Sequence, residues 1–248
     1  MRRPWPAARR ARILAAMTTT LITGANKGLG HEAARRLLAA GHRVWIGARD
    51  ADRGRAAADA LGEGARSIVL DVTDDASVAA AAAALAAAGG LDVLVNNAGI
   101  LGALTPVPET SAGEVAHVLE TNVLGIVRVT HAFLPLLERS GNPVVVNVSS
   151  GMGSFAVTSD PDRFESTLVG LAYPASKAAV TMVTMQYAKA LPHMRVNAVD
   201  PGYTATDFNA RRGTQTVEEG TDAIVRMAQL DASGPTGTFV DRQGTVPW

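Results

Sequence analysis

Cysteine is absent from all 248 residues of this chain. Its absence rules out a disulfide framework, a thiolate nucleophile and a cysteine-based zinc site, and we predict no metal site of any other kind. No apolar run approaches the ~20 residues that a membrane-spanning helix needs, so we predict neither a transmembrane segment nor a membrane partner. We therefore expect a cytoplasmic protein.

The chain also lacks a net charge, because 23 Lys and Arg balance 23 Asp and Glu. The charges are unevenly distributed. Five Arg and no acidic residue lie within residues 1–17, which leaves 18 basic and 23 acidic residues in the remainder. A mildly acidic body gives no electrostatic reason to expect nucleic acid as a partner.

The first 16 residues differ in composition from the rest of the chain. They are rich in Arg, Ala and Pro, and the apolar stretch Ala11–Ala16 is interrupted by Arg12 and too short for a secretory signal. We interpret residues 1–16 as a disordered leader, with Met17 as the natural start of the protein. A targeting segment, or one that binds an anionic surface, is the alternative.

From Met17 onward, short apolar strands alternate with helices. The predicted strands are Thr19–Thr23, Arg43–Ala48, Arg66–Leu70, Leu91–Val95, Val144–Val148, Val196–Val199 and Thr238–Val240. The predicted helices are Glu32–Ala40, Asp52–Leu61, Asp75–Ala88, Ser111–Glu138, Pro174–Ala190 and Thr216–Gln229. Continuous apolar strands between helices are typical of a parallel sheet covered on both faces. Residues 17–248 are thus predicted to form one α/β domain, a doubly wound parallel sheet of the Rossmann type.

A glycine-rich turn connects the first predicted strand to the first helix. Gly24, Gly28 and Gly30 follow the pattern Gly-x3-Gly-x-Gly. Glycine permits a positive φ and lets the backbone approach a pyrophosphate without a Cβ, and the helix N-terminus adds free N–H groups. This strand–turn–helix context favours a dinucleotide cofactor over a purely structural turn.

The end of the second strand indicates which cofactor is bound. A residue that binds the ribose 2′-OH of NAD is usually acidic, whereas the 2′-phosphate of NADP requires a cation. Ala48 occupies that position, Arg49 follows it, and Lys27 lies within the glycine turn. Arg49 and Lys27 could together bind a phosphate dianion. We predict NADP(H), although Asp50 could pair with Arg49 or meet a ribose, and Arg49 could be a simple surface residue.

Tyr173 and Lys177 lie four residues apart, on the same side of a predicted helix. Pro174 is tolerated in the first turn of that helix, where its missing N–H is no loss. A phenol has an ordinary pKa of ~10, and a nearby ammonium favours the phenolate. The pair is therefore a candidate acid–base catalyst.

Other polar residues follow the ends of neighbouring strands, where open α/β sheets bind ligands. They are Asn96-Asn97-Ala98-Gly99, Ser149-Ser150 and Pro201-Gly202-Tyr203-Thr204-Ala205-Thr206. A serine hydroxyl in such a position could hold a substrate oxygen as charge develops on it. Asn122 lies in the helix after the fourth strand, where a buried amide would need hydrogen-bond partners.

These motifs, in this order, resemble those of the short-chain dehydrogenase/reductase family along essentially all of residues 18–248. The resemblance implies catalysis by Ser150, Tyr173 and Lys177, with Asn122 supporting a proton relay. It also implies contacts of Asp71 and Val72 with adenine, of Asn97 with the ribose region, of Lys177 with the nicotinamide ribose, and of Gly202, Thr204 and Thr206 with the carboxamide. The implied cofactor-binding set is Gly24, Asn26, Lys27, Gly28, Leu29, Gly30, Arg49, Asp71, Val72, Asn97, Ala98, Gly99, Tyr173, Lys177, Pro201, Gly202, Thr204 and Thr206.

One departure from the family pattern points to a particular branch. Ser150 and Tyr173 lie 23 residues apart, a longer separation than is common in the family, so residues 151–172 contain an insertion. The insertion and the C-terminus are similar to those of carbonyl reductase-like members. We prefer Ser150 as the catalytic serine, with Ser149 as the alternative.

Together these features predict an NADPH-dependent reductase of a ketone or aldehyde. An NAD-dependent alcohol dehydrogenase is the first alternative, and a non-catalytic nucleotide-sensing protein on the same fold is the second. The partner would be a small carbonyl or alcohol, bound between residues 101–108, 151–172 and 203–214, whose pocket shape the motifs do not define. The charged insertion favours a monomer, with a homodimer next.

Overall fold

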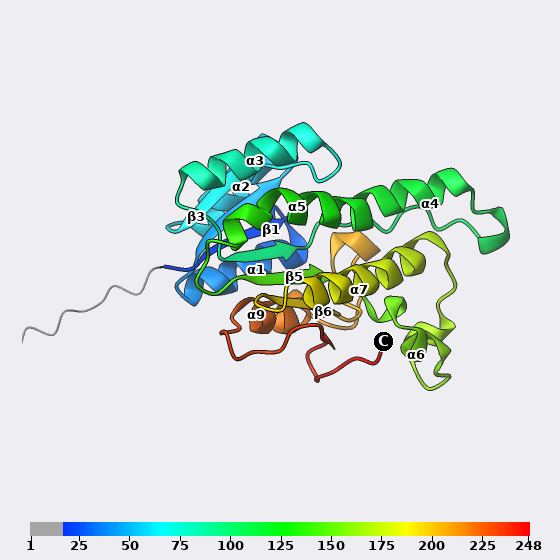
Figure 1. Cartoon of the computed structure of the whole chain (residues 1–248). Helices are drawn as coiled ribbons and strands as arrows, with labels where there is room; N and C mark the ends of the chain where they lie inside the picture. Colours follow the sequence, from blue (N-terminus) through cyan, green and yellow to red (C-terminus); the bar gives the residue numbers. More distant parts are fainter. Residues whose placement is uncertain (1–16) are drawn as a thin grey trace, which may run out of the picture.

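The computed structural model describes residues 17–248, so the predicted leader lies outside the described residues. They form one seven-stranded sheet with helices on both faces (Figure 1). Its strands are β1 (Thr19–Thr23), β2 (Arg43–Ala48), β3 (Ala65–Val69), β4 (Val93–Asn96), β5 (Val144–Val148), β6 (Arg195–Val199) and β7 (Phe239–Val240). All neighbouring strands are parallel, in the order β3-β2-β1-β4-β5-β6-β7. The predicted doubly wound fold is confirmed.

Two apolar cores lie on opposite faces of the sheet because successive strand residues point to opposite sides. Ile22 of β1 packs with helices α1 (Gly28–Ala39), α2 (Ala51–Leu61) and α9 (Asp222–Ala228). Its neighbour Leu21 packs on the other face with α3 (Asp75–Ala87), α5 (Gly125–Leu137) and α7 (Ala172–Ala190). Small alanines on α1 and α2 let these helices lie close to the sheet.

The predicted long helix over residues 111–138 is interrupted. It consists of α4 (Ala112–Leu119), a π-helical segment η2 (Glu120–Leu124) and α5. The wider turn contains Asn122, whose buried side chain bonds to neighbouring backbone and side-chain groups instead of facing solvent. Such π turns often occur where a helix must present a side chain to a functional site.

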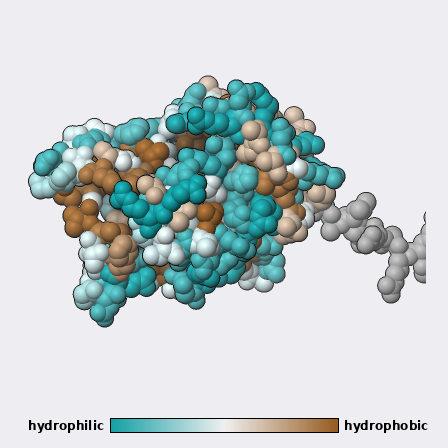
Figure 2. Space-filling model, turned by 180° about the vertical axis from the view of Figure 1, so that it is seen from behind, coloured by the Kyte–Doolittle hydropathy of each residue, from teal (hydrophilic) through white to brown (hydrophobic). Residues whose placement is uncertain are grey.

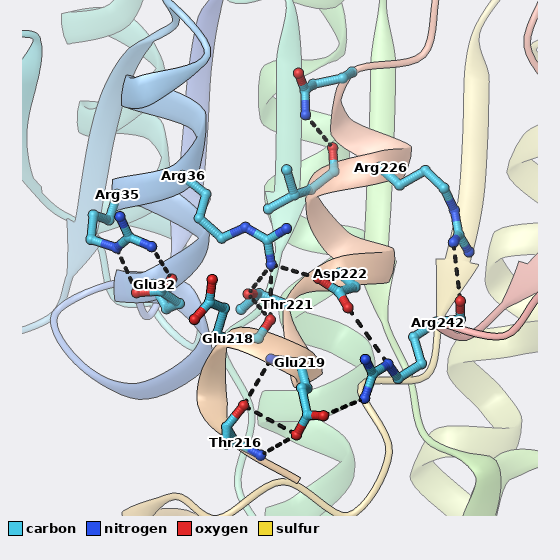
Figure 3. Close-up of polar contacts among 12 residues, drawn as sticks. Glu32, Arg35, Arg36, Thr216, Glu218, Glu219, Thr221, Asp222, Arg226 and Arg242 are labelled. Atoms are coloured by element: carbon cyan, nitrogen blue, oxygen red, sulfur yellow. Dashed lines mark hydrogen bonds and ion pairs between the residues drawn. The ribbon is translucent and has the colours of Figure 1, made fainter.

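The predicted helix over residues 216–229 is also divided, into α8 (Val217–Gly220) and α9, with Thr221 between them. A polar cluster at this junction holds both helices against α1 (Figure 3). Arg36 of α1 donates to the Glu218 carbonyl at 2.8 Å and to Thr221 Oγ1 at 2.9 Å, and pairs with Asp222 at 2.8 Å. These contacts explain the break, because the Glu218 carbonyl and Thr221 hydroxyl bond to Arg36.

The carboxyl ends of the strands carry most of the irregular structure. Here lie η1 (Val107–Glu109), η3 (Gly151–Gly153), α6 (Phe155–Ser159), η4 (Phe164–Thr167) and η5 (Asp207–Asn209). The inserted residues 151–172 thus contain three short helices, and α4 and α6 extend beyond the sheet toward the same end (Figure 1). Among residues 17–248, no helix is both long and apolar enough to cross a membrane.

Candidate active site

Tyr173 and Lys177 lie at the N-terminal end of α7, next to the carboxyl end of β5. The Lys177 ammonium is 5.6 Å from the centre of the Tyr173 ring and donates a hydrogen bond to the Val148 carbonyl at 2.8 Å. Only 5% of Lys177 is exposed. Helical spacing therefore places both groups on one face, and packing against β5 buries the ammonium.

Burial changes the pKa of both groups. It lowers the pKa of Lys177 to about 8, although the nearby Asp200 carboxyl opposes the shift. Burial also raises the pKa of Tyr173 above its ordinary value, and the nearby Ser150 hydroxyl opposes that change. In the chain alone, burial thus outweighs the phenolate stabilisation expected from the ammonium. The phenol is protonated at neutral pH, as a proton donor must be.

The two adjacent serines at the end of β5 have different partners. Ser149 is buried, and its hydroxyl donates to the Lys177 carbonyl at 3.0 Å. Ser150 begins the η3 turn, where its hydroxyl accepts from the Met152 amide at 3.2 Å and lies close enough to the Tyr173 phenol to lower the pKa of that phenol. Ser149 thus holds α7 against the sheet, whereas Ser150 faces the phenol. This geometry favours Ser150 as the serine that contacts substrate.

Asn122 connects the fourth strand to the Tyr173 helix. Its Oδ1 accepts from the Ile100 amide at 2.8 Å, and its Nδ2 donates to the Ile100 carbonyl at 2.9 Å and to Ser176 Oγ at 3.0 Å. Ser176 in turn donates to the Tyr173 carbonyl at 2.7 Å. The amide thus satisfies its hydrogen bonds while fully buried, and it ties the chain after β4 to the helix that carries the phenol.

The glycine turn has the backbone that the sequence predicted. Gly24 and Gly28 have φ values of +63° and +59°, which favour glycine. A Cβ on Gly30 would lie 2.6 Å from the Asn97 amide nitrogen, so only glycine permits this approach. Asn97 Nδ2 donates to the carbonyls of Thr23 and Gly24 at 2.9 and 3.2 Å. Asn97 therefore braces the glycine turn.

The residues around the turn fit a dinucleotide. Helix α1 begins at Gly28 and has no acidic residue in its first turn, so its free N–H groups can receive a pyrophosphate. Asn26 and Leu29 are half-buried beside them. Ala98 lies against Gly24, where a Cβ on the glycine would come within 3.0 Å of the Ala98 Cα. A Cβ on Gly99 would lie 3.8 Å from Lys177 Nζ, which places the chain after β4 beside Lys177.

Three charged residues, Arg49, Asp50 and Lys27, lie on the segments expected to meet the 2′-phosphate. Arg49 is exposed just after β2. Asp50 is the N-cap of α2, where it accepts from the Arg53 amide at 3.0 Å, so its carboxylate serves the helix and pairs with Arg53 rather than Arg49. The Lys27 ammonium is exposed and pairs with Asp207 at 3.5 Å.

The remaining predicted cofactor residues lie at the ends of β3 and β6. Asp71 accepts hydrogen bonds from the backbone and hydroxyl of Thr73, which lower its pKa, and Val72 packs against Gly125. Pro201 and Gly202 form a turn with φ +68° at the glycine, and the Thr204 hydroxyl donates to the Pro201 carbonyl at 2.9 Å. Thr206 lies at the N-cap of η5. The structure brings all predicted site residues to one edge of the sheet.

A cavity of about 650 Å³ lies beside this site. Parts of the predicted segments 151–172 and 203–214 line it, whereas sequence reasoning missed the contributions of Asp200 and residues 241–243. Its lining includes the carboxyl groups of Glu165, Asp200 and Asp241, the Arg163 guanidinium, and Tyr203. Asp200 directly follows β6 and precedes Pro201. The sequence signal that could have revealed Asp200 was its position, because it is a carboxylate at the end of a strand and next to the Pro201-Gly202 turn.

The end of the molecule that carries α4 and α6 is also rich in exposed apolar surface, seen from behind at the left of Figure 2. The segments around the predicted substrate site contribute the exposed residues Leu104, Phe155, Phe164, Val169, Leu171 and Phe208. The Phe208 ring lies 5.7 Å from the Tyr173 ring, and the Phe164 ring lies 5.4 Å from the Tyr203 ring. An apolar substrate would find complementary surface here.

Comparison with known proteins gives consistent matches. The family model of short chain dehydrogenases matches residues 18–216. The chain is 33% identical to a (+)-neomenthol dehydrogenase from Arabidopsis thaliana, covering 90% of this chain and 95% of the relative. It is 31% identical to a salutaridine reductase from Papaver bracteatum, covering 91% and 94%. A structure of NADPH-bound carbonyl reductase from chicken fatty liver superposes with a TM-score of 0.83 at 26% identity, covering 94% of this chain and 99% of that one.

Proposed function

The chain belongs to the short-chain dehydrogenase/reductase family, in its carbonyl reductase-like branch, and on that premise we propose that it is an NADPH-dependent reductase of ketones or aldehydes. The observation that carries the proposal is the arrangement of a protonated phenol, a buried ammonium and a serine hydroxyl around one point. The Ser150 hydroxyl lies beside the Tyr173 phenol and lowers its pKa, and the Lys177 ammonium lies 5.6 Å from the centre of the Tyr173 ring.

When bound, NADPH supplies a hydride from C4 of its nicotinamide to the carbonyl carbon and leaves as NADP⁺. Ser150 donates a hydrogen bond to the carbonyl oxygen, which polarises the bond and holds the oxygen close to Tyr173. Tyr173 donates its proton to that oxygen, so the carbonyl becomes an alcohol and the phenolate regains a proton from solvent. The Lys177 ammonium stabilises the phenolate that this transfer leaves behind.

Three segments would hold the cofactor. The glycine turn and the N-terminus of α1 would bind the pyrophosphate, with Asp71 and Val72 near the adenine. Arg49 and Lys27 would bind the 2′-phosphate through a guanidinium fork and a point charge. Chicken carbonyl reductase, a structural neighbour, binds NADPH, which supports this choice. We further propose a cytoplasmic location.

The proposal is tested by following NADPH oxidation with a panel of apolar ketones and aldehydes. The Tyr173→Phe variant keeps the ring and its packing but lacks the proton donor, so its turnover should fall by ~10²–10⁴ while NADPH binding persists. Retained turnover in this variant would refute the assignment. A chain that binds NADPH but reduces no carbonyl would favour the non-catalytic alternative, and a preference for NADH would favour the NAD-dependent dehydrogenase.

A further inference from the structure

The carboxyl group of Asp200, which lines the cavity described above, is buried beside Tyr173 and Lys177. Asp200 directly follows β6, and only 5% of it is exposed. Its amide donates to the Val240 carbonyl at 2.8 Å, which fixes its backbone to β7. A charged residue is rarely buried without partners, because desolvation is costly. The groups that contact the Asp200 carboxylate therefore indicate what it does.

The Asp200 carboxylate contacts the backbone of two different segments. Its Oδ1 accepts from the Gly202 amide at 2.9 Å, and its Oδ2 lies against the backbone of Gly151, whose amide lowers the pKa of the carboxyl. Gly151 directly follows Ser150, and Gly202 belongs to the turn expected at the nicotinamide. One side chain thus connects the backbone beside the substrate oxygen to the backbone beside the cofactor ring.

The glycine at position 151 matches this arrangement. A Cβ at this position would lie 3.0 Å from Asp200 Oδ2 and 2.9 Å from Glu165 Oε1. Any other residue here would push the carboxylate away from the Gly151 amide. The inserted segment therefore reaches the active site at this point, through Glu165.

We propose that Asp200 is a positioning residue, whose carboxylate ties the backbone of Ser150-Gly151 to the Pro201-Gly202 turn and thereby aligns the substrate oxygen with the nicotinamide ring. This inference rests on the proposed reductase function and deepens it. Hydride transfer depends steeply on the distance and angle between donor and acceptor, and misplacement by about 1 Å can cost ~10²-fold in rate. A buried carboxylate that is bonded to one of these backbones and packed against the other can hold that geometry.

The charge of Asp200 also acts on the catalytic pair. The charged and titratable groups that face it are Tyr173 and Lys177 on α7, Arg163 and Glu165 in the insertion, and Asp241 after β7. The carboxylate raises the pKa of Lys177 and that of Tyr173. Both effects preserve the ammonium and the protonated phenol that reduction requires.

The two arginines that line the cavity pair with other groups. Arg163 pairs with Glu165 at 3.4 Å. Arg242 pairs with Glu219 at 2.7 Å and with Asp222 at 3.5 Å (Figure 3). Within residues 17–248, neither forms an ion pair with Asp200. Burial raises the pKa of Asp200, and the Glu165 and Asp241 carboxyls add to this effect. The Gly202 and Gly151 amides and the Lys177 ammonium act in the opposite direction and favour the ionised form.

The test compares Asp200→Asn with Asp241→Asn. Asp241 lines the same cavity, but its carboxylate accepts from the Gln243 and Gly244 amides, away from the catalytic residues. The control therefore removes the same charge from the same cavity. We expect Asp200→Asn to lower kcat about tenfold or more with a smaller change in KM for NADPH, and to increase the isotope effect with NADPH deuterated at C4.

The pH profile supplies a second measurement. The Asp200 carboxylate raises the pKa of both Tyr173 and Lys177, so its removal should move the alkaline limb of the reduction to lower pH. Asp241→Asn should keep the wild-type kcat, isotope effect and alkaline limb. If Asp200→Asn does not fold, Asp200→Ser, which keeps a hydroxyl beside the Gly202 amide, is measured in the same way.

The outcomes separate this inference from the proposed function. The inference would be overturned if Asp200→Asn kept the wild-type kcat, isotope effect and alkaline limb of the pH profile. It would also be overturned if Asp200→Asn and Asp241→Asn lost the same fraction of kcat. If the wild type reduced no carbonyl, the proposed function would fail, and the inference would be judged on the fluorescence of bound NADPH. An emission changed by Asp200→Asn and not by Asp241→Asn would support it, and unchanged emission would overturn it.

Discussion

Lys27 in the glycine turn and Asp207 in η5 form an ion pair with a nitrogen–oxygen distance of 3.5 Å. The two side chains come from segments 180 positions apart in sequence, and both are more than half exposed. Exposed pairs of this kind contribute little to stability. A phosphate dianion can therefore replace the carboxylate as the partner of the ammonium, with Arg49 adding a second cation.

This arrangement predicts a clear preference for NADPH. NADPH should bind at least tenfold more tightly than NADH, which corresponds to a difference of about 1.4 kcal/mol in binding free energy. Arg49→Ala should remove most of the preference, whereas Asp207→Asn, which releases Lys27, should tighten NADPH binding and leave NADH unchanged. Fluorescence titration of the three proteins measures these constants. Equal dissociation constants for the two cofactors in the wild type would contradict the prediction.

The adjacent serines at the end of β5 provide a matched pair of variants. Ser150→Ala removes the donor to the substrate oxygen and should lower kcat by ~10²–10³. Ser149→Ala removes a buried hydrogen bond to the Lys177 carbonyl, so it should cost about 1 kcal/mol of stability and leave kcat within a few-fold. Steady-state kinetics and thermal unfolding measure both effects. The reverse pattern would make Ser149 the catalytic serine.

The choice between these two serines could not be made from the sequence alone. The apolar strands that alternate with helices, together with the glycine turn, were sufficient to predict the fold. The four-residue spacing was sufficient to predict that Tyr173 and Lys177 share one face of α7. Which hydroxyl faces the phenol depends on the η3 turn after β5, a local geometry that no motif encodes. Asp200 was missed because its proposed role depends on a tertiary contact with Gly151, which lies 49 positions away in the sequence. The division of the predicted long helix likewise follows from tertiary contacts of Asn122.

The reductive activity should decline in alkaline solution. Reduction requires the Lys177 ammonium, and burial lowers the pKa of this group to about 8. The ammonium is therefore present at neutral pH and is lost as the pH rises through about 8. The pH profile of kcat for NADPH-dependent reduction, in buffers of constant ionic strength, tests this. A rate that stays constant up to pH 10 would show that the ammonium remains charged in the complex.

Lys177 should reduce stability at neutral pH. Its pKa is about 8 in the folded chain and 10.5 for an ordinary lysine, so below pH 8 the fold must bury a charge. Above pH 10.5 the lysine is neutral in both the folded and the unfolded chain, and burial carries no charge penalty. The penalty grows as the pH falls toward 8, because the unfolded chain takes up a proton first. Replacement by Met should raise the free energy of unfolding at pH 7 by about 1–3 kcal/mol, since the lost bond to Val148 and the lost attraction to Asp200 offset part of the gain.

The check is urea unfolding of Lys177→Met and wild type between pH 6 and 10.5. The difference should be largest below pH 8 and shrink toward 10.5, as the wild type loses its buried charge. Lys189→Met, on the exposed last turn of the same helix, is the control and should show no such dependence. A destabilised Lys177→Met at every pH would mean that the hydrogen bond outweighs the desolvation.

The final prediction concerns assembly. Symmetric pairing would use the exposed faces of α5 and α7, where Val127 and Met182 are exposed. The insertion leads directly into the N-terminal end of α7, and its charged residues Asp160 and Asp162 are exposed there. Charged groups at an interface core would have to be desolvated, which disfavours association.

We therefore expect a chain that starts at Met17 to be a monomer at micromolar concentration, as measured by light scattering. A dimer would mean that the insertion covers only the substrate mouth and leaves the helix faces free. Met182→Glu would then dissociate it, because a carboxylate would replace an apolar contact on the two-fold axis or beside it. A stable tetramer would show that the insertion blocks neither face, and the argument from its charge would be wrong.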